Sequence, residues 1–164
     1  MMCRMAKSVV TEQVYEAPLA TVAAMLSDPA FREEVCDEQN ALSKTVTIDG
    51  GVDAKKVRIE MVQPTEGVPG FAKKVVGATT TVIQSEVWTS PTSATVDIEI
   101  PGKPGQISGT VAIVEKDGKT IETITLSATV KVPLIGGKLE DLVLSMIGSA
   151  LRREQRVGVR YLSR

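Results

Sequence analysis

Apolar and polar residues alternate along most of the chain, which is the pattern of β-strands with one buried face. Val96, Ile98 and Ile100 show it most clearly, because polar residues separate them. Asp117-Gly118 stands between two such segments and is a strong hairpin signal. The pattern predicts strands at residues 8–15, 43–49, 57–62, 79–88, 95–100, 107–113 and 124–132.

A different spacing, typical of helices, appears in two parts of the sequence. After Pro18, apolar residues recur every three or four positions and predict a helix that ends before Asp28-Pro29. Asp28 is expected to cap a second short helix at about 30–37. Near the C-terminus, one apolar stripe predicts a long helix from Lys138 to Tyr161.

The order of these elements predicts the architecture. It runs from one strand through two short helices and about six antiparallel strands to the long helix. A helix of roughly 24 residues is about 36 Å long and can cover the apolar face of a curved sheet. We therefore expect an α+β fold, an antiparallel sheet curled around the C-terminal helix, in one domain over residues 1–164 with its core at about 8–161.

Composition excludes several kinds of chemistry. The chain has no histidine, which removes Ser-His-Asp and Cys-His catalysis and His-ligated zinc. Two cysteines, Cys3 and Cys36, are too few for a disulfide framework or a metal site. The net charge of −1 does not favour nucleic-acid binding, and no motif for a metal or a cofactor is present. We expect no cofactor.

The sequence also bears on membranes and export. The longest charge-free stretch near the C-terminus, Leu142 to Leu151, has ten residues, about half of what a membrane-spanning helix needs. The first residues lack the pattern of a secretory leader. We therefore expect a cytoplasmic protein without an integral membrane segment.

Three segments resemble the SRPBCC superfamily, also called START-like or Bet v 1-like. They are residues 17–22 (APLATV), 26–31 (LSDPAF) and 132–140 (VPLIGGKLE). In detail the chain is similar to an uncharacterised, largely actinobacterial branch of unknown function. The resemblance spans about Ser8 to Tyr161 and implies a helix-grip fold with a cavity between the sheet and the long helix. Members of the superfamily bind lipids, sterols, polyketides or hormones, and a minority are cyclases, aromatases or hydratases.

A cavity under the long helix would be lined by apolar residues of the helix and of the inward strand faces. The flexible Met146 and the small Ala150 leave room that larger residues would fill, although the same stripe also suits plain core packing. Aromatic residues make up only 3% of the chain, which favours an incompletely filled interior. The candidate lining residues are Val57, Ile59, Met61, Phe71, Val75, Leu126, Val130, Leu139, Leu142, Val143, Met146 and Ala150.

Acid–base catalysis without histidine needs a carboxylate pair or a similar constellation. Glu60 and Glu86 lie on adjacent predicted strands, but the alternation favours a solvated outer face for Arg58 and Glu60. We see no cluster of polar groups in the expected cavity. Together with this absence, the resemblance to the superfamily implies non-catalytic binding of a hydrophobic small molecule or lipid, by a monomer or a homodimer.

Two alternatives stay open. The first is a polyketide cyclase- or aromatase-like enzyme. Three or more buried ionisable groups in the largest interior pocket would favour this alternative. The second is a protein-interaction or assembly factor, which predicts a filled interior and a sizeable exposed apolar patch.

Two further features have both a functional and a structural interpretation. Carboxylates next to Cys36 are expected to raise its pKa, so a reactive thiolate is disfavoured. Arginines gather on one face near the C-terminus, where they suit either the helix dipole or peripheral contact with an anionic surface. The residues proposed for that contact are Arg152, Arg156 and Arg160.

The segment from Gly67 to Gly77 is predicted to be a short helix or ordered loop. Its glycines give the backbone freedom, and Val68, Phe71, Val75 and Val76 would form an apolar underside. The segment is either a lid over the cavity or an ordinary connection anchored by Phe71.

Overall fold

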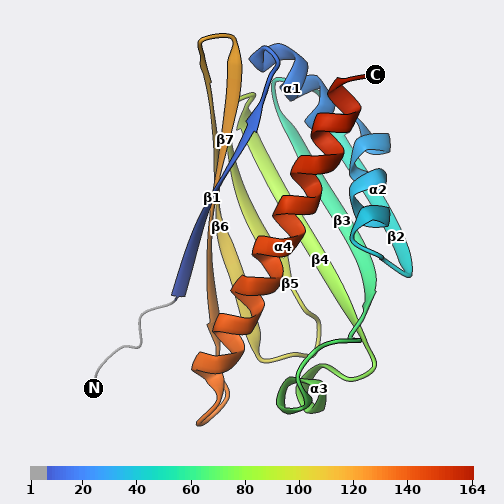
Figure 1. Cartoon of the computed structure of the whole chain (residues 1–164), viewed down its shortest axis with the longest axis vertical. Coiled ribbons are helices and arrows are strands. Elements are labelled where there is room, and N and C mark those ends of the chain that lie inside the picture. Colours follow the sequence, from blue (N-terminus) through green and yellow to red (C-terminus); the bar gives the residue numbers. More distant parts are fainter. Residues whose placement is uncertain (1–6) are drawn as a thin grey trace.

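A computed structural model describes residues 7–164, which form an antiparallel sheet of seven strands in the order β1-β7-β6-β5-β4-β3-β2. Figure 1 shows α4 lying diagonally across one face of this sheet, with α1 and α2 beside its C-terminal half and α3 at the opposite end of the molecule. The helices are α1 (Leu19–Leu26), α2 (Pro29–Glu38), α3 (Gly70–Val76) and α4 (Gly136–Leu162). The strands are β1 (Lys7–Tyr15), β2 (Ser43–Gly50), β3 (Lys55–Pro64), β4 (Thr79–Ser90), β5 (Ser93–Glu99), β6 (Gly105–Lys116) and β7 (Lys119–Val130).

The architecture confirms the predicted α+β helix-grip fold. Asp28 caps α2, where its carboxylate accepts a hydrogen bond from the backbone N–H of Ala30 at 2.9 Å. Asp117 and Gly118 both have positive φ, 54° and 77°, as the tight turn between β6 and β7 requires. Cys3 lies outside the described residues. In the described part, no helix has the length and apolar character needed to cross a membrane.

The face that β1 turns inward carries polar residues. Val10 and Val14 are exposed, whereas Gln13 and Tyr15 are buried. The reason is the packing of Tyr15 on α4: a Cβ at Gly158 would lie 2.6 Å from the Tyr15 ring, so only glycine leaves room for it. Because side chains alternate along a strand, this contact also turns Gln13 inward.

Hydrogen bonds hold α4 against the sheet. Gln13 on β1 donates to the carbonyl of Leu151 at 2.9 Å, and the carboxylate of Glu140 accepts from the N–H of Val130 at 2.8 Å. At the other end of α4, Tyr161 packs edge-on against Phe31 of α2, with ring centroids 5.7 Å apart. These contacts fix the helix over the concave face of the sheet along its whole length.

One glycine sets how closely two central strands approach. Gly109 on β6 pairs with Leu126 on β7. A Cβ at Gly109 would lie only 1.7 Å from the carbonyl oxygen of Thr125, so no side chain fits there. A glycine inside a strand often marks such a close approach of two backbones.

Candidate functional site

A cavity of about 200 Å³ lies between the concave face of the sheet and α4. This is more than ten times the space that one buried water needs. Its walls are mainly apolar and come from both sides. Strand residues on the walls include Val82, Val96, Ile98, Ile107, Val111 and Ile124.

Seven of the twelve predicted lining residues border this cavity: Met61, Leu126, Leu139, Leu142, Val143, Met146 and Ala150. The structure therefore brings the α4 stripe and part of the sheet together as expected. Val57, Ile59 and Val130 are buried elsewhere in the apolar core, and they do not border the cavity. A position on the inward face of a strand does not by itself border the cavity, because other core side chains cover these three residues.

The short helix α3 and the residues before it close one end of the cavity, but with a different face than expected. Val68, Ala72 and Val76 line it, because residues four apart share one side of a helix. Phe71 is 40% exposed, and neither it nor Val75 borders the cavity. Val75 packs instead on the small cluster of Ala72, Val130 and Leu139. Val75 therefore belongs to the expected apolar underside without lining the cavity. The expectation is wrong for Phe71, which is neither part of that underside nor an anchor in the core.

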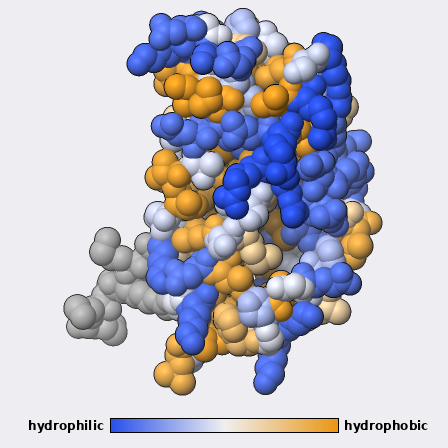
Figure 2. All heavy atoms as spheres, in the orientation of Figure 1, coloured by the Kyte–Doolittle hydropathy of each residue, from blue (hydrophilic) through white to orange (hydrophobic). Residues whose placement is uncertain are grey.

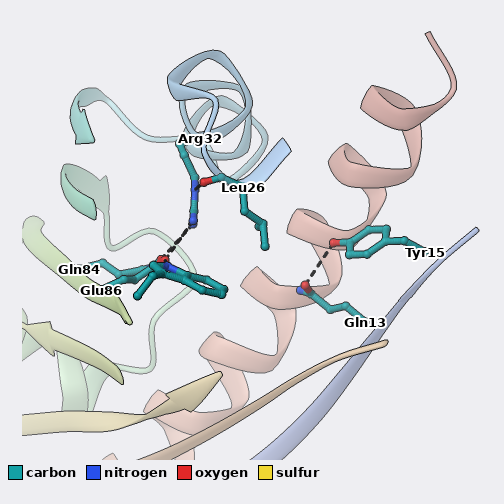
Figure 3. Close-up of polar contacts among 7 residues, drawn as sticks. Gln13, Tyr15, Leu26, Arg32, Gln84 and Glu86 are labelled. Atoms are coloured by element: carbon teal, nitrogen blue, oxygen red, sulfur yellow. Dashed lines mark hydrogen bonds and ion pairs between the residues drawn. The ribbon is translucent and has the colours of Figure 1, made fainter. Parts of the chain in front are cut away.

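The opposite end of the cavity is charged. It is lined by Arg32, Glu86, Glu122 and Glu154, which come from α2, β4, β7 and α4; we refer to these four residues as the charged end. Figure 3 shows Arg32 pointing from α2 toward Glu86 on the sheet. The expectation that no polar cluster would converge in the cavity is wrong.

Arg32 and Glu86 form a buried, two-pronged ion pair with N–O distances of 2.9 and 3.0 Å (Figure 3). Arg32 also donates to the carbonyl of Leu26 at 3.0 Å. Glu86 accepts further hydrogen bonds from Trp88 at 2.8 Å and from Gln84 at 2.6 Å. Burial by itself would raise the pKa of Glu86, but the Arg32 charge and these donors outweigh it and lower the pKa. The pair is thus satisfied by the protein itself.

Glu122 and Glu154 are in a different state. Glu122 is 3% exposed, and its Oε2 has no hydrogen-bond partner among residues 7–164. Burial, followed by the charge of Glu154, raises the pKa of Glu122 to about 8. Burial likewise raises the pKa of Glu154 to about 7. Two carboxyl groups with raised pKa values therefore stand at the end of an apolar cavity, where they can hold or exchange a proton near neutral pH.

The sequence carries a signal for Glu122 and Glu154, although neither residue is apolar. Glu122 is in phase with Ile124 and Leu126 along β7, and Glu154 follows Leu151 by one helical turn. No comparable signal marks Arg32, because its partner Glu86 is 54 positions away in the chain.

Other charged and reactive side chains lie outside the cavity. Arg58 and Glu60 form an exposed ion pair at 3.0 Å, which confirms the predicted outer face. The pKa of Cys36 is raised to about 11, as expected, although burial contributes more than the neighbouring Asp37. A reactive thiolate is therefore disfavoured at this position.

The C-terminal arginines connect two helices. Arg160 pairs with Glu34 at 3.3 Å and with Glu38 at 3.4 Å, so it is engaged by α2 rather than free to meet an anionic surface. Arg152 and Arg156 are exposed. Figure 2 shows hydrophilic side chains gathered over α2 and the C-terminal half of α4, and more hydrophobic ones over the lower half of the same face.

We expect the free energy of unfolding to fall as the pH rises from about 5.5 to about 8.5. Because the pKa values of Glu122 and Glu154 are raised in the folded state, the native protein keeps protons that the unfolded chain has lost. This stabilisation is complete below the unfolded pKa and disappears as the pH rises through the folded values. For each carboxyl group that is protonated only in the folded state, the free energy of unfolding falls by roughly 1.4 kcal/mol per pH unit. Urea unfolding at a series of pH values measures it.

Glu122→Gln is expected to flatten this dependence, since the amide cannot ionise, and to stabilise the protein at about pH 8.5. Glu60→Gln, in the exposed pair with Arg58, is the matched control and should keep the wild-type slope. A wild-type stability that stays level or increases over this pH range would contradict the assignment.

A sheet wrapped on a long C-terminal helix, with a cavity between the two, defines the helix-grip fold of START-like and Bet v 1-like proteins. Within this class, the chain belongs to the family described as "Protein of unknown function (DUF2505)", which it matches over residues 11–162. None of the curated proteins compared matches the chain. Its expected place in a largely actinobacterial branch stays a prediction.

Solved structures share the fold at low sequence identity. A protein from Thermus thermophilus is 20% identical, with a TM-score of 0.65 over 96% of this chain and 100% of that one. The Zhui aromatase/cyclase from Streptomyces sp. R1128 is 17% identical, with a TM-score of 0.56 over 95% and 90%. A START superfamily protein from Mycobacterium smegmatis is 16% identical, with a TM-score of 0.55 over 92% and 97%.

Proposed function

We propose that the protein binds a hydrophobic small molecule in the cavity between the sheet and α4. The observation that carries this proposal is the cavity itself, an apolar space of about 200 Å³ bordered by residues of both layers. Ligand sites are typically such apolar hollows with a few polar groups at defined places. Hydrophobic burial then provides the affinity, and the charged end orients the ligand.

The alternative of an interaction protein predicted a filled interior, and the cavity argues against it. The enzyme alternative gains support instead. Three or more ionisable groups in the cavity were expected to favour an enzyme, and four border it. Arg32 and Glu86 satisfy each other, which leaves Glu122 and Glu154 as the candidate proton carriers. If the protein turns its ligand over, Glu122→Gln should abolish turnover while it leaves binding of the apolar body intact.

The binding proposal is tested by filling the cavity. Ala150→Leu adds bulk on the lining face of α4, and we expect it to weaken binding of a neutral fluorescent hydrophobic probe such as N-phenyl-1-naphthylamine by at least about tenfold. Ser145→Leu adds similar bulk on an exposed position of the same helix and should leave the affinity unchanged. Native mass spectrometry of freshly purified protein should show a bound small molecule that Ala150→Leu loses. Equal probe affinity in wild type and Ala150→Leu would place the probe elsewhere and contradict the proposal.

A further inference from the structure

The charged end of the cavity has more acceptors than donors. Oε2 of Glu122 is buried without a hydrogen-bond partner among the described residues, and Glu154 borders the same cavity from α4. A buried carboxyl oxygen without a donor is unusual in a folded protein and costs free energy. Because this oxygen lies at the end of an otherwise apolar cavity, a bound ligand could supply the missing hydrogen-bond donor.

The donors around it bond to other groups, and none of them reaches Oε2 of Glu122. Arg32 gives its bonds to Glu86 and to the carbonyl of Leu26. Gln84 and Trp88 donate to Glu86 as well. Gln13 donates to the carbonyl of Leu151 and accepts from the hydroxyl of Tyr15 at 3.2 Å (Figure 3). It also hydrogen-bonds the carboxyl group of Glu154, which leaves Glu122 as the carboxyl without a donor at Oε2.

Once Glu122 and Glu154 are ionised, the balance of charge at this end of the cavity favours a cation. The buried cations here are Arg32 and Lys55, and the ammonium of Lys55 lies 4.4 Å from the centre of the Trp88 ring. Three carboxyl groups, those of Glu86, Glu122 and Glu154, oppose these two positive charges. When all three are ionised, one negative charge remains without compensation. An anionic head group such as a fatty-acid carboxylate would add to this repulsion.

We propose that the cavity takes a basic amphiphile, a molecule whose apolar body lies against α4 and whose protonated amine binds between Glu122 and Glu154. This inference rests on the proposed function and names the class of ligand. An ammonium group offers three N–H donors and no acceptor, so it suits two carboxyl groups that face it from β7 and α4. The cation favours the ionised carboxylates, and the proton that Glu122 holds near neutral pH passes to the buffer when the amine binds.

Three probes with one apolar body and different head groups test this proposal: 2-(2-naphthyl)ethylamine, 2-(2-naphthyl)ethanol and 2-naphthylacetic acid. Calorimetric titrations at about pH 7 should show that the amine binds at least about tenfold more tightly than the alcohol, and that the acid binds most weakly. Titrations in two buffers with different ionisation enthalpies should show proton release on binding of the amine and none on binding of the alcohol.

Variants locate the head group. Glu122→Gln should remove the tenfold advantage of the amine and leave the affinity for the alcohol unchanged, whereas the exposed control Glu60→Gln should keep the advantage. If Glu122→Gln does not fold, the proton release of the wild type decides alone.

The outcomes separate the two proposals. If the alcohol binds as tightly as the amine, or the acid binds most tightly, the inference about the head group is overturned while binding in the cavity stands. If none of the three binds, both proposals are overturned.

Discussion

Replacing Arg32 with methionine should lower the free energy of unfolding by about 3 to 5 kcal/mol. The substitution keeps most of the buried volume but leaves the carboxylate of Glu86, which is only 4% exposed, without its cation. Urea unfolding at about pH 7 measures the loss. Most of that loss comes from the stranded charge rather than from the removed contact, which makes the result specific to a buried pair.

Two further variants test this explanation. Arg32→Met combined with Glu86→Leu removes both charges, and we expect it to recover most of the lost stability, because apolar residues can replace a buried ion pair. Arg58→Met breaks the exposed pair with Glu60 and should cost less than about 1 kcal/mol. If Arg32→Met costs no more than Arg58→Met, the pair does not have the energetic role described.

Gly109→Ala should destabilise the protein by more than about 3 kcal/mol or prevent folding, because the new Cβ meets the backbone of β7 rather than a movable side chain. Overpacking in a core typically costs about 1 to 3 kcal/mol when side chains can shift. Here the β6–β7 backbone pairing itself must open. Thermal unfolding and the yield of folded protein are the measurements.

Gly105→Ala is the matched control on the same strand. Its Cβ would lie 3.5 Å from the nearest atom, a side-chain carbon of Val130, which is an ordinary contact. We therefore expect an unfolding temperature close to that of the wild type. If Gly109→Ala unfolds at the same temperature as Gly105→Ala, the close approach of β6 and β7 does not have the importance described.

The fold could be predicted because the hydrophobic pattern records which face each element buries. Strands such as β5, and the long stripe of α4, follow that pattern closely, so their existence and order were evident. The first strand shows the limit. Val10 and Val14 face outward, whereas the inward face carries Gln13 and Tyr15 beside Val9, and a pattern of apolar residues does not mark Gln13.

The charged end of the cavity could not be predicted in the same way. The pattern along β7 shows that Glu122 faces inward, but not that Glu154 and Arg32 approach it from two helices. Nor does it show that Oε2 of Glu122 lacks a partner, since that depends on every donor nearby. The cavity is equally a property of packing, because Val57 and Ile59 have the same pattern as Met61 and only Met61 borders it.

The pairing of β1 with β7 has a consequence for the order in which the chain folds. Residues that meet across these strands, such as Ser8 and Ser127, are 119 positions apart in the sequence. Each strand from β2 to β6 pairs with the strand that follows it, so that part of the sheet can assemble as synthesis proceeds. The first strand to leave the ribosome therefore waits for the last strand before it finds its partner, and pairings of such long range fold slowly. Until then, the nascent chain carries an unpaired β1 whose polar groups and exposed valines can associate with other chains.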